Sequence, residues 1–310
     1  MNVTLMLAAM IAAAAIEKPL TAPGPQGKLA GTLVDAGKDA PMVLIIPGSG
    51  PTDRDGNSPL GVAAAPYRLL AEEMGKRGIS SVRIDKRGMF GSKGAIPDAN
   101  KVTIADYAAD IHAWVASIRK STGVKCVWVL GHSEGGMVAL VAAQRPKDIC
   151  GVMTVAAVGR KVGTVMRDQL RANPANAPIL DAALGAIDAL EAGKRVDSAT
   201  LPAPLQTLFN DDVQPFLIDL FAEDPAGLAA ALKVPLLIVQ GDKDIQVSVD
   251  DAKSLAAAQP KAGLALLPGV NHVLKLPAGE DRAANLRAYA DPSLPIAPSV
   301  VEAIAKFVKP

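Results

Sequence analysis

"VLGHSEGGM", residues 129–137, connects an apolar run to a run of small and aliphatic residues through a corner with one serine between glycines. Gly131, Ser133 and Gly135 have the spacing G-x-S-x-G, which places the serine on a sharp turn between a strand and a helix. Such a turn strains the serine backbone, and small residues at 131 and 135 let the strand and the helix approach each other. The stretch therefore predicts a strand–turn–helix unit with Ser133 as a nucleophile.

On both sides of this corner, short β-branched runs alternate with amphipathic helical runs. This alternation is typical of a mostly parallel sheet with helices on both faces, so we predict an α/β fold. The expected strands are 28–34, 42–47, 80–85, 126–130, 151–157, 235–240 and 264–269, and the expected helices are 67–78, 104–120, 136–145, 249–259 and 299–309.

Residues 160–232 contain no strand-like run and are predicted to form several short helices punctuated by prolines. An insertion after the C-terminal end of a strand lies over the ligand crevice of an open α/β sheet. We therefore expect a helical lid at 160–232, inserted between core segments 17–159 and 233–310. The larger apolar residues of the lid are expected to pack mainly on one another rather than line a pocket; they are Phe209, Phe216, Leu217, Leu220 and Phe221.

An acid and a histidine follow two later strands, where open α/β sheets keep their sites. "GDKD" comes after residues 235–240 and "VNH" after 264–269, so Ser133, Asp244 and His272 follow the chain order serine, acid, histidine. In this arrangement His272 accepts the Ser133 proton as general base, and Asp244 holds the imidazole in the required tautomer.

Other residues compete for these two roles. Asp242 lies on the same loop as Asp244; we favour Asp244 as the acid and expect Asp242 to cap the turn. The chain has three histidines. His112 is expected inside a helix and His132 beside the serine, pointing elsewhere, which leaves His272 as the general base.

The oxyanion of an acyl-transfer intermediate needs two preorganised N–H donors. Glu134, the residue after the serine, supplies one, and the second is expected from the loop "PGSGPTDRDGN", residues 47–57, with Ser49 favoured and Gly50 as the alternative. Gly48 and Gly50 would let this backbone approach the substrate, although a loop rich in glycine and proline can also be a simple turn.

Five separated motifs resemble those of the α/β-hydrolase superfamily, in particular bacterial carboxylesterases of the serine aminopeptidase or lysophospholipase-like group. They are "PGSGPTDRDGN", "DKRGMFGS", "LGHSEGG", "QGDKDIQV" and "LPGVNHVLK". The resemblance implies a core sheet with a helical cap and hydrolysis of esters of short to medium acyl chains, without metal or cofactor, through an acyl-serine intermediate. It also implies a chiefly structural role for the loop that begins at Asp85.

The sequence leaves other functions open. An amidase or peptidase would use the same three residues, and some members of this fold bind a ligand with little turnover. No H-x-H, H-E-x-x-H or C-x-x-C spacing predicts a metal site. Arg54 could hold a substrate carboxylate, but we favour an internal salt bridge with a nearby aspartate. Asn271 is expected to shape the turn before His272.

Composition bears on partners and location. The chain has 32 basic and 31 acidic residues, which gives no reason to expect nucleic acid or an anionic membrane surface as partner. We expect residues 1–16 to form a signal peptide cleaved near Ala13 to Ala15, with export of the protein; a retained helix or membrane tether is the alternative. Cys126 and Cys150 start neighbouring strands and could form a disulfide, but two buried free thiols are slightly favoured.

Overall fold

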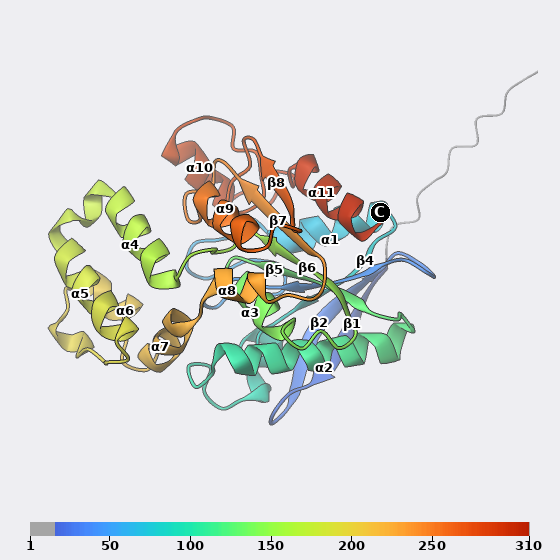
Figure 1. Cartoon of the computed structure of the whole chain (residues 1–310), viewed down its shortest axis with the longest axis horizontal. Coiled ribbons are helices and arrows are strands. Elements are labelled where there is room, and N and C mark those ends of the chain that lie inside the picture. Colours follow the sequence, from blue (N-terminus) through green and yellow to red (C-terminus); the bar gives the residue numbers. More distant parts are fainter. Residues whose placement is uncertain (1–15, 310) are drawn as a thin grey trace, which may run out of the picture.

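The computed structural model describes residues 16–309 and contains an eight-stranded sheet with helices on both faces (Figure 1). The strand order is β1-β2-β4-β3-β5-β6-β7-β8; β2 is antiparallel to both of its neighbours and the other pairs are parallel. The predicted α/β fold is thus confirmed. The strands are β1 Ile16–Pro23, β2 Lys28–Asp35, β3 Met42–Ile46, β4 Ser80–Ile84, β5 Val127–His132, β6 Ile149–Val155, β7 Leu236–Gly241 and β8 Gly263–Leu267.

The edge strand β1 was not predicted from the sequence. It pairs with β2 along its whole length and contains Pro19 and Pro23. Proline cannot donate to a β-ladder and is therefore found mainly in edge strands. Because of its two prolines, this segment lacks the residue pattern that predicts a strand. Ile16, the last residue of the expected leader, is the first residue of β1, and the expected cleavage region lies outside the described residues.

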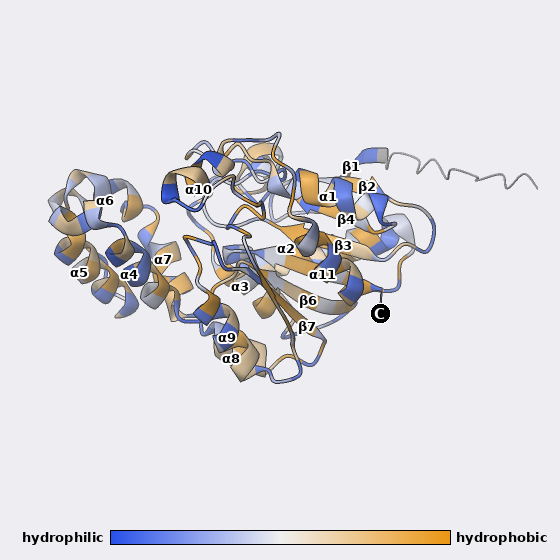
Figure 2. Cartoon of the chain, turned by 90° about the horizontal axis from the view of Figure 1, so that it is seen from above, coloured by the Kyte–Doolittle hydropathy of each residue, from blue (hydrophilic) through white to orange (hydrophobic). Residues whose placement is uncertain are grey.

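Helices cover the sheet in two layers, each with its own apolar core. The helices α2, α3, α8 and α9 pack on one face, and α1 and α11 pack on the other. Strand β3 is buried throughout and is coloured as hydrophobic in Figure 2. The bounds are α1 Pro66–Lys76, η1 Phe90–Ala95, α2 Ile104–Thr122, α3 Glu134–Ala142, α8 Pro225–Ala230, α9 Val249–Ala258, α10 Arg282–Tyr289 and α11 Pro298–Val308.

The long helix α2 begins and ends at clear sequence signals. Thr103 and Asp106 form a reciprocal capping box, and Gly123 ends the helix in the left-handed conformation. The side of α2 that faces the sheet buries Trp114 and Ile118, among others. This helix covers the sheet beside β5, which leads to Ser133.

Residues 160–222 form a cap that stands apart from the sheet at one end of the molecule in both views (Figures 1 and 2). Its elements are α4 Val162–Ala172, η2 Pro174–Ile179, α5 Leu180–Glu191, η3 Ser198–Thr200, α6 Ala203–Leu208 and α7 Gln214–Ala222. The buried Gln214 amide donates to the carbonyls of Val196 and Phe209, which ties these short elements together. Helix α8, placed in the expected lid, instead packs on α3 and α9 of the core.

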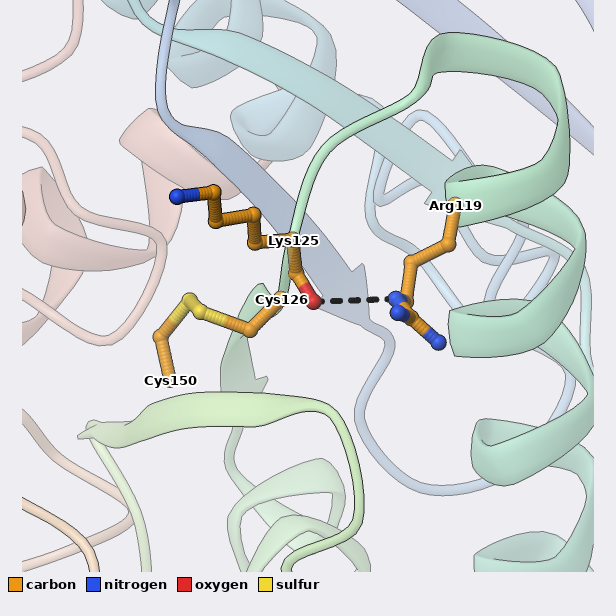
Figure 3. The surroundings of a disulfide bond; sticks show 4 residues. All are labelled: Arg119, Lys125, Cys126 and Cys150. Carbon is orange, nitrogen blue, oxygen red and sulfur yellow. Dashed lines mark hydrogen bonds between the residues drawn. A yellow bond between two sulfur atoms is a disulfide. The ribbon is translucent and has the colours of Figure 1, made fainter.

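Cys126 and Cys150 form a disulfide, so the slightly favoured prediction of free thiols is wrong (Figure 3). Their Cα atoms lie 5.3 Å apart at the start of β5 and β6. The Lys125 carbonyl next to the bridge accepts a hydrogen bond of 2.9 Å from Arg119 of α2 (Figure 3). Bridging depends on strand register, which the sequence pattern does not fix to one residue.

Candidate active site

The corner at Ser133 has the geometry that its sequence predicts. Strand β5 ends at His132 and helix α3 begins at Glu134, and between them Ser133 has φ 53° and ψ −122°. A positive φ is unfavourable for a residue with a side chain, and the surroundings must hold it. The Ser133 N–H donates to the Val155 carbonyl at 3.0 Å, and the Ser133 carbonyl accepts from the Gly136 N–H at 2.9 Å.

The glycines around Ser133 are needed for space. A Cβ atom at Gly131 would lie 2.0 Å from the Gly135 carbonyl oxygen, and one at Gly135 would lie 2.5 Å from the Ile46 carbonyl oxygen. Neither position has room for a side chain, because backbone atoms cannot move aside as a flexible side chain can. The prediction that residues 131 and 135 must be small is confirmed.

Asp244 and His272 come together although 28 residues separate them. His272 Nδ1 lies 2.8 Å from Asp244 Oδ2, and both side chains are buried. Asp244 also accepts hydrogen bonds from the backbone N–H groups of Gln246 and Val247 and from the Gln240 side chain. These three hydrogen bonds hold the carboxylate in place independently of the imidazole.

Asp242 has the other role that its position suggested. Its Oδ1 accepts from the Gly269 N–H at 2.7 Å, so it ties the β7 loop to the loop that carries His272. Because Asp244 accepts from Nδ1–H of His272, Nε2 of that ring is left as a proton acceptor. Within residues 16–309, neither this Nε2 nor Ser133 Oγ has a hydrogen-bond partner; such catalytic bonds often form only when substrate is bound.

His132 is buried, and its ring links Tyr67 to the loop that carries His272. Its Nε2 lies 2.8 Å from the His272 carbonyl oxygen, and its Nδ1 lies 2.8 Å from Tyr67 Oη. Burial, aided by nearby His272, lowers the pKa of His132 to about 3, so the ring is neutral. A carbonyl only accepts; therefore Nε2 carries the proton, and the Tyr67 hydroxyl donates to Nδ1.

The predicted oxyanion loop is held at Gly48 by two buried side chains. The Gly48 N–H donates to Tyr67 Oη at 3.0 Å, and the Gly48 carbonyl accepts from Lys86 Nζ at 2.7 Å. Both polar groups of Gly48 are thus occupied, so its expected role in binding substrate is replaced by support of the loop. Ser49 and Gly50 do line the cavity described below.

Two N–H groups beside Ser133 have no acceptor in the part of the chain that the structure describes. Glu134 is the first residue of α3, where an N–H has no intrahelical partner. Among residues 16–309, no group accepts from the Ser49 N–H. Both residues line the same cavity as Ser133, so the structure brings the predicted donor residues and the predicted nucleophile to one place.

Lys86 and the Glu134 side chain are functional candidates that the sequence reasoning missed. Their charged groups lie 3.1 Å apart, both side chains are more than 90 % buried, and both line the cavity. Buried charges persist in proteins when they are paired and hydrogen-bonded. The sequence contains a signal for this pair, since each residue is a charged member of a motif next to a predicted strand.

A cavity of about 1330 Å³ lies between the core and the cap, with Ser133 on its wall. Core residues such as Met89 and Met137 line one side, and cap residues such as Val165 and Met166 line the other. Phe216, Leu217 and Leu220 of α7 also line it, so the expectation that they pack within the lid rather than line a pocket is wrong for these three. Phe209 and Phe221 are buried elsewhere in the cap.

The charge of this wall is small. Of the described residues that line the cavity, Lys86 and Glu134 are the only charged ones, and they neutralise each other. Within residues 16–309, no group of three or more His, Cys, Asp or Glu residues is arranged to hold a metal ion, and no helix is long and apolar enough to cross a membrane.

The remaining motif residues support the site from behind. Arg54 pairs with Asp85, which confirms the expected internal salt bridge, here with an aspartate of the next motif. Arg87 binds Asp110 of α2, so the loop after β4 is anchored to the core. Asn271 accepts from the Lys275 N–H and shapes the turn that carries His272.

Comparison with known proteins identifies the fold. Residues 60–184 match the family model described as serine aminopeptidase, S33, a segment that contains Ser133 but neither Asp244 nor His272. The chain is 30 % identical over 240 residues to Esterase EstD of Thermotoga maritima, which covers 76 % of this chain and 53 % of EstD. The chain thus spans about half the length of this curated relative.

Solved structures give the same result over nearly the whole chain. The esterase Pf2001 of Pyrococcus furiosus matches with a TM-score of 0.59 and 17 % identity, covering 95 % of this chain and 92 % of its own. Est1E of Butyrivibrio proteoclasticus matches with a TM-score of 0.57 and 17 % identity, covering 93 % of this chain and 96 % of its own. At this level of identity the likeness establishes the fold.

Proposed function

We propose that this chain, which is an α/β hydrolase, is a serine esterase that cleaves carboxylic esters through an acyl-Ser133 intermediate. The observation that carries the proposal is the meeting at one cavity of a strained serine and two N–H groups that have no acceptor among residues 16–309, with a buried Asp244–His272 pair on the loops after β7 and β8. The esterase relative and the esterase structures support the same reaction class.

The mechanism follows from the roles of these groups. As Ser133 Oγ attacks the ester carbonyl, His272 Nε2 takes the hydroxyl proton, and the Asp244 carboxylate stabilises the resulting imidazolium. The carbonyl oxygen becomes an oxyanion that accepts from the N–H groups of Glu134 and Ser49. The intermediate then expels the alcohol, which receives the proton from His272, and water hydrolyses the acyl enzyme by the same steps in reverse order.

The cavity wall favours neutral esters over peptides with a free N-terminus. An aminopeptidase must bind the α-ammonium of its substrate, and a carboxylate is the usual partner for such a charge. Glu134 is the only carboxylate among the described lining residues, and Lys86 already neutralises it. A mostly apolar wall is suited to the acyl chain of a neutral ester instead.

The short to medium acyl preference implied by the family resemblance remains a prediction. The cavity volume of about 1330 Å³ exceeds the roughly 300–1,000 Å³ of common ligand sites, so acyl groups larger than acetyl have room. We also propose that the protein is exported, as its apolar N-terminal run suggests. The Cys126–Cys150 disulfide supports this, since such bridges persist in oxidising compartments.

The experiment is hydrolysis of p-nitrophenyl esters from acetate to long acyl chains, with matched anilides, by the wild type and Ser133→Ala. We expect ester turnover in the wild type, a loss of at least about a thousandfold in the variant, and much slower anilide turnover. Ester hydrolysis that survives in Ser133→Ala would overturn the assignment of the nucleophile. Rapid anilide turnover with little ester turnover would favour a peptidase.

A further inference from the structure

We propose that Lys86 is a positioning residue that holds the Gly48–Ser49 peptide in the orientation needed for oxyanion binding, together with Tyr67. This inference rests on the proposed function and adds to it residues outside the Ser133, Asp244 and His272 set. Lys86 lies in the loop after β4, Tyr67 in α1 and Gly48 in the loop after β3, so three separate segments meet at one peptide.

The first step concerns the direction of the Ser49 N–H. The described chain has no cis peptide bonds, and in a trans peptide the C=O and the following N–H point in opposite directions. The Gly48 carbonyl points at Lys86 Nζ, 2.7 Å away. The Ser49 N–H therefore points away from the ammonium and is free to donate to a ligand.

The second step concerns what fixes this peptide. Gly48 is clamped on both sides, because its N–H donates to Tyr67 Oη while its carbonyl accepts from Lys86. A hydrogen bond from a charged donor in a buried place is stronger than a neutral one. If the peptide rotated by half a turn, a carbonyl oxygen would replace the N–H donor and repel the oxyanion.

The third step concerns Lys86 itself. Its side chain is 96 % buried, and its Nζ pairs with Glu134 Oε1 at 3.1 Å and lies 5.3 Å from the centre of the Tyr107 ring. Glu134 also carries the other proposed oxyanion donor, its own backbone N–H. One buried ion pair therefore links the two halves of the oxyanion hole: the Ser49 peptide through Lys86 and the start of α3 through Glu134.

The position of this peptide beside the nucleophile makes its orientation matter. A Cβ atom at Gly48 would lie 3.2 Å from Ser133 Cβ, so the loop is in close contact with the serine. On its other side, Tyr67 donates to His132, whose Nε2–H binds the His272 carbonyl. The clamp on Gly48 thus continues to the backbone of the proposed general base.

The test uses Lys86→Met, which keeps the length of the side chain and removes its donor, and Tyr67→Phe, which removes one oxygen. Each is assayed with the best p-nitrophenyl ester and with a trifluoromethyl ketone of the same acyl chain. Ser133 Oγ adds to this ketone carbonyl, the hydroxyl proton passes to His272, and the ketone oxygen becomes an oxyanion in the proposed hole. The matched control is Arg87→Met, which removes the adjacent buried cation from the same loop without touching Gly48.

We expect kcat to fall about 10- to 100-fold in Lys86→Met and several-fold in Tyr67→Phe, with KM changed by less than about threefold. The inhibition constant of the ketone should rise by the same factor as kcat/KM falls, because both report stabilisation of the oxyanion. Arg87→Met should lower thermal stability but keep kcat. If Lys86→Met does not fold, kcat and the ketone inhibition constant of Tyr67→Phe test the proposal.

Two results would overturn the proposal. In the first, kcat and the ketone constant both stay within about twofold of the wild type in the folded variants. In the second, kcat falls in Lys86→Met while ketone affinity is unchanged. Either result leaves the esterase assignment intact, since that assignment depends on the loss of turnover in Ser133→Ala.

Discussion

Ser133 is the residue at which backbone strain coincides with the proposed reactivity. Its positive φ is held by backbone bonds to Val155 and Gly136, and such strain costs about 1–3 kcal/mol. The backbone around Ser133 cannot shift to relieve this strain, because neighbouring backbone atoms pack closely against Gly131 and Gly135. The strained turn therefore lowers stability, and it places Ser133 at the end of β5 on the wall of the cavity.

This strain predicts a difference in stability between two Ser133 variants, both of which we expect to be inactive. Ser133→Gly adopts the positive φ without a Cβ penalty, whereas Ser133→Ala keeps that penalty. We expect the glycine variant to be more stable than the alanine variant by about 1 kcal/mol, after allowing for its more flexible unfolded chain. Urea unfolding of both proteins measures the difference, and an alanine variant as stable as the glycine variant would mean that the Cβ penalty at Ser133 is no larger than the entropic cost of glycine in the unfolded chain.

At the scale of elements, the strand ends bring the site together. The loops after β3, β5, β7 and β8 meet at the carboxyl edge of the parallel sheet, as expected for this architecture. The opposite ends of β5 and β6 carry the Cys126–Cys150 disulfide, so the bridge and Ser133 lie at the two ends of β5. The bridge therefore bears on the stability of these two central strands and not on the chemistry.

Removal of the disulfide should lower stability and leave activity nearly unchanged. The two cysteines are separated by 24 residues, and closing a loop of that size stabilises a protein by about 3 kcal/mol. We expect the double variant Cys126→Ser, Cys150→Ser to unfold at lower temperature while its kcat at 25 °C stays within about twofold of the wild type. Reducing agent should lower the midpoint of the wild type but not of the variant. Equal midpoints for all samples would show that the bridge contributes nothing.

At the scale of the whole molecule, the cap forms one wall of the cavity that we propose as the substrate site. Helix α4 supplies Val165 and Met166 to the wall opposite Ser133, and α7 supplies Phe216, Leu217 and Leu220. The cap is tied internally by the ion pairs of Arg167 with α5 and by the Gln214 amide. Its position over the site depends on packing between elements and not on any motif.

A larger side chain on the cap wall should therefore shorten the preferred acyl chain. We expect Met166→Trp to lower kcat/KM for long-chain esters by about tenfold or more and to leave acetate hydrolysis nearly unchanged. Leu286→Trp is the control, because Leu286 is exposed on α10 outside the cavity wall. Equal losses for short and long esters would indicate a general disturbance of the cap.

The sequence alone predicted the alternating architecture, the turn at Ser133 and the pairing of His272 with Asp244 rather than Asp242, all of which the structure contains. Each depends on local periodicity or on residues adjacent in the chain, where steric limits act over a few residues. Only the tertiary structure decided the Cys126–Cys150 bridge, the edge strand β1, the cavity-facing side of α7 and the clamp of Lys86 on Gly48. These depend on register and on contacts between distant segments, which a pattern of hydrophobic residues does not specify.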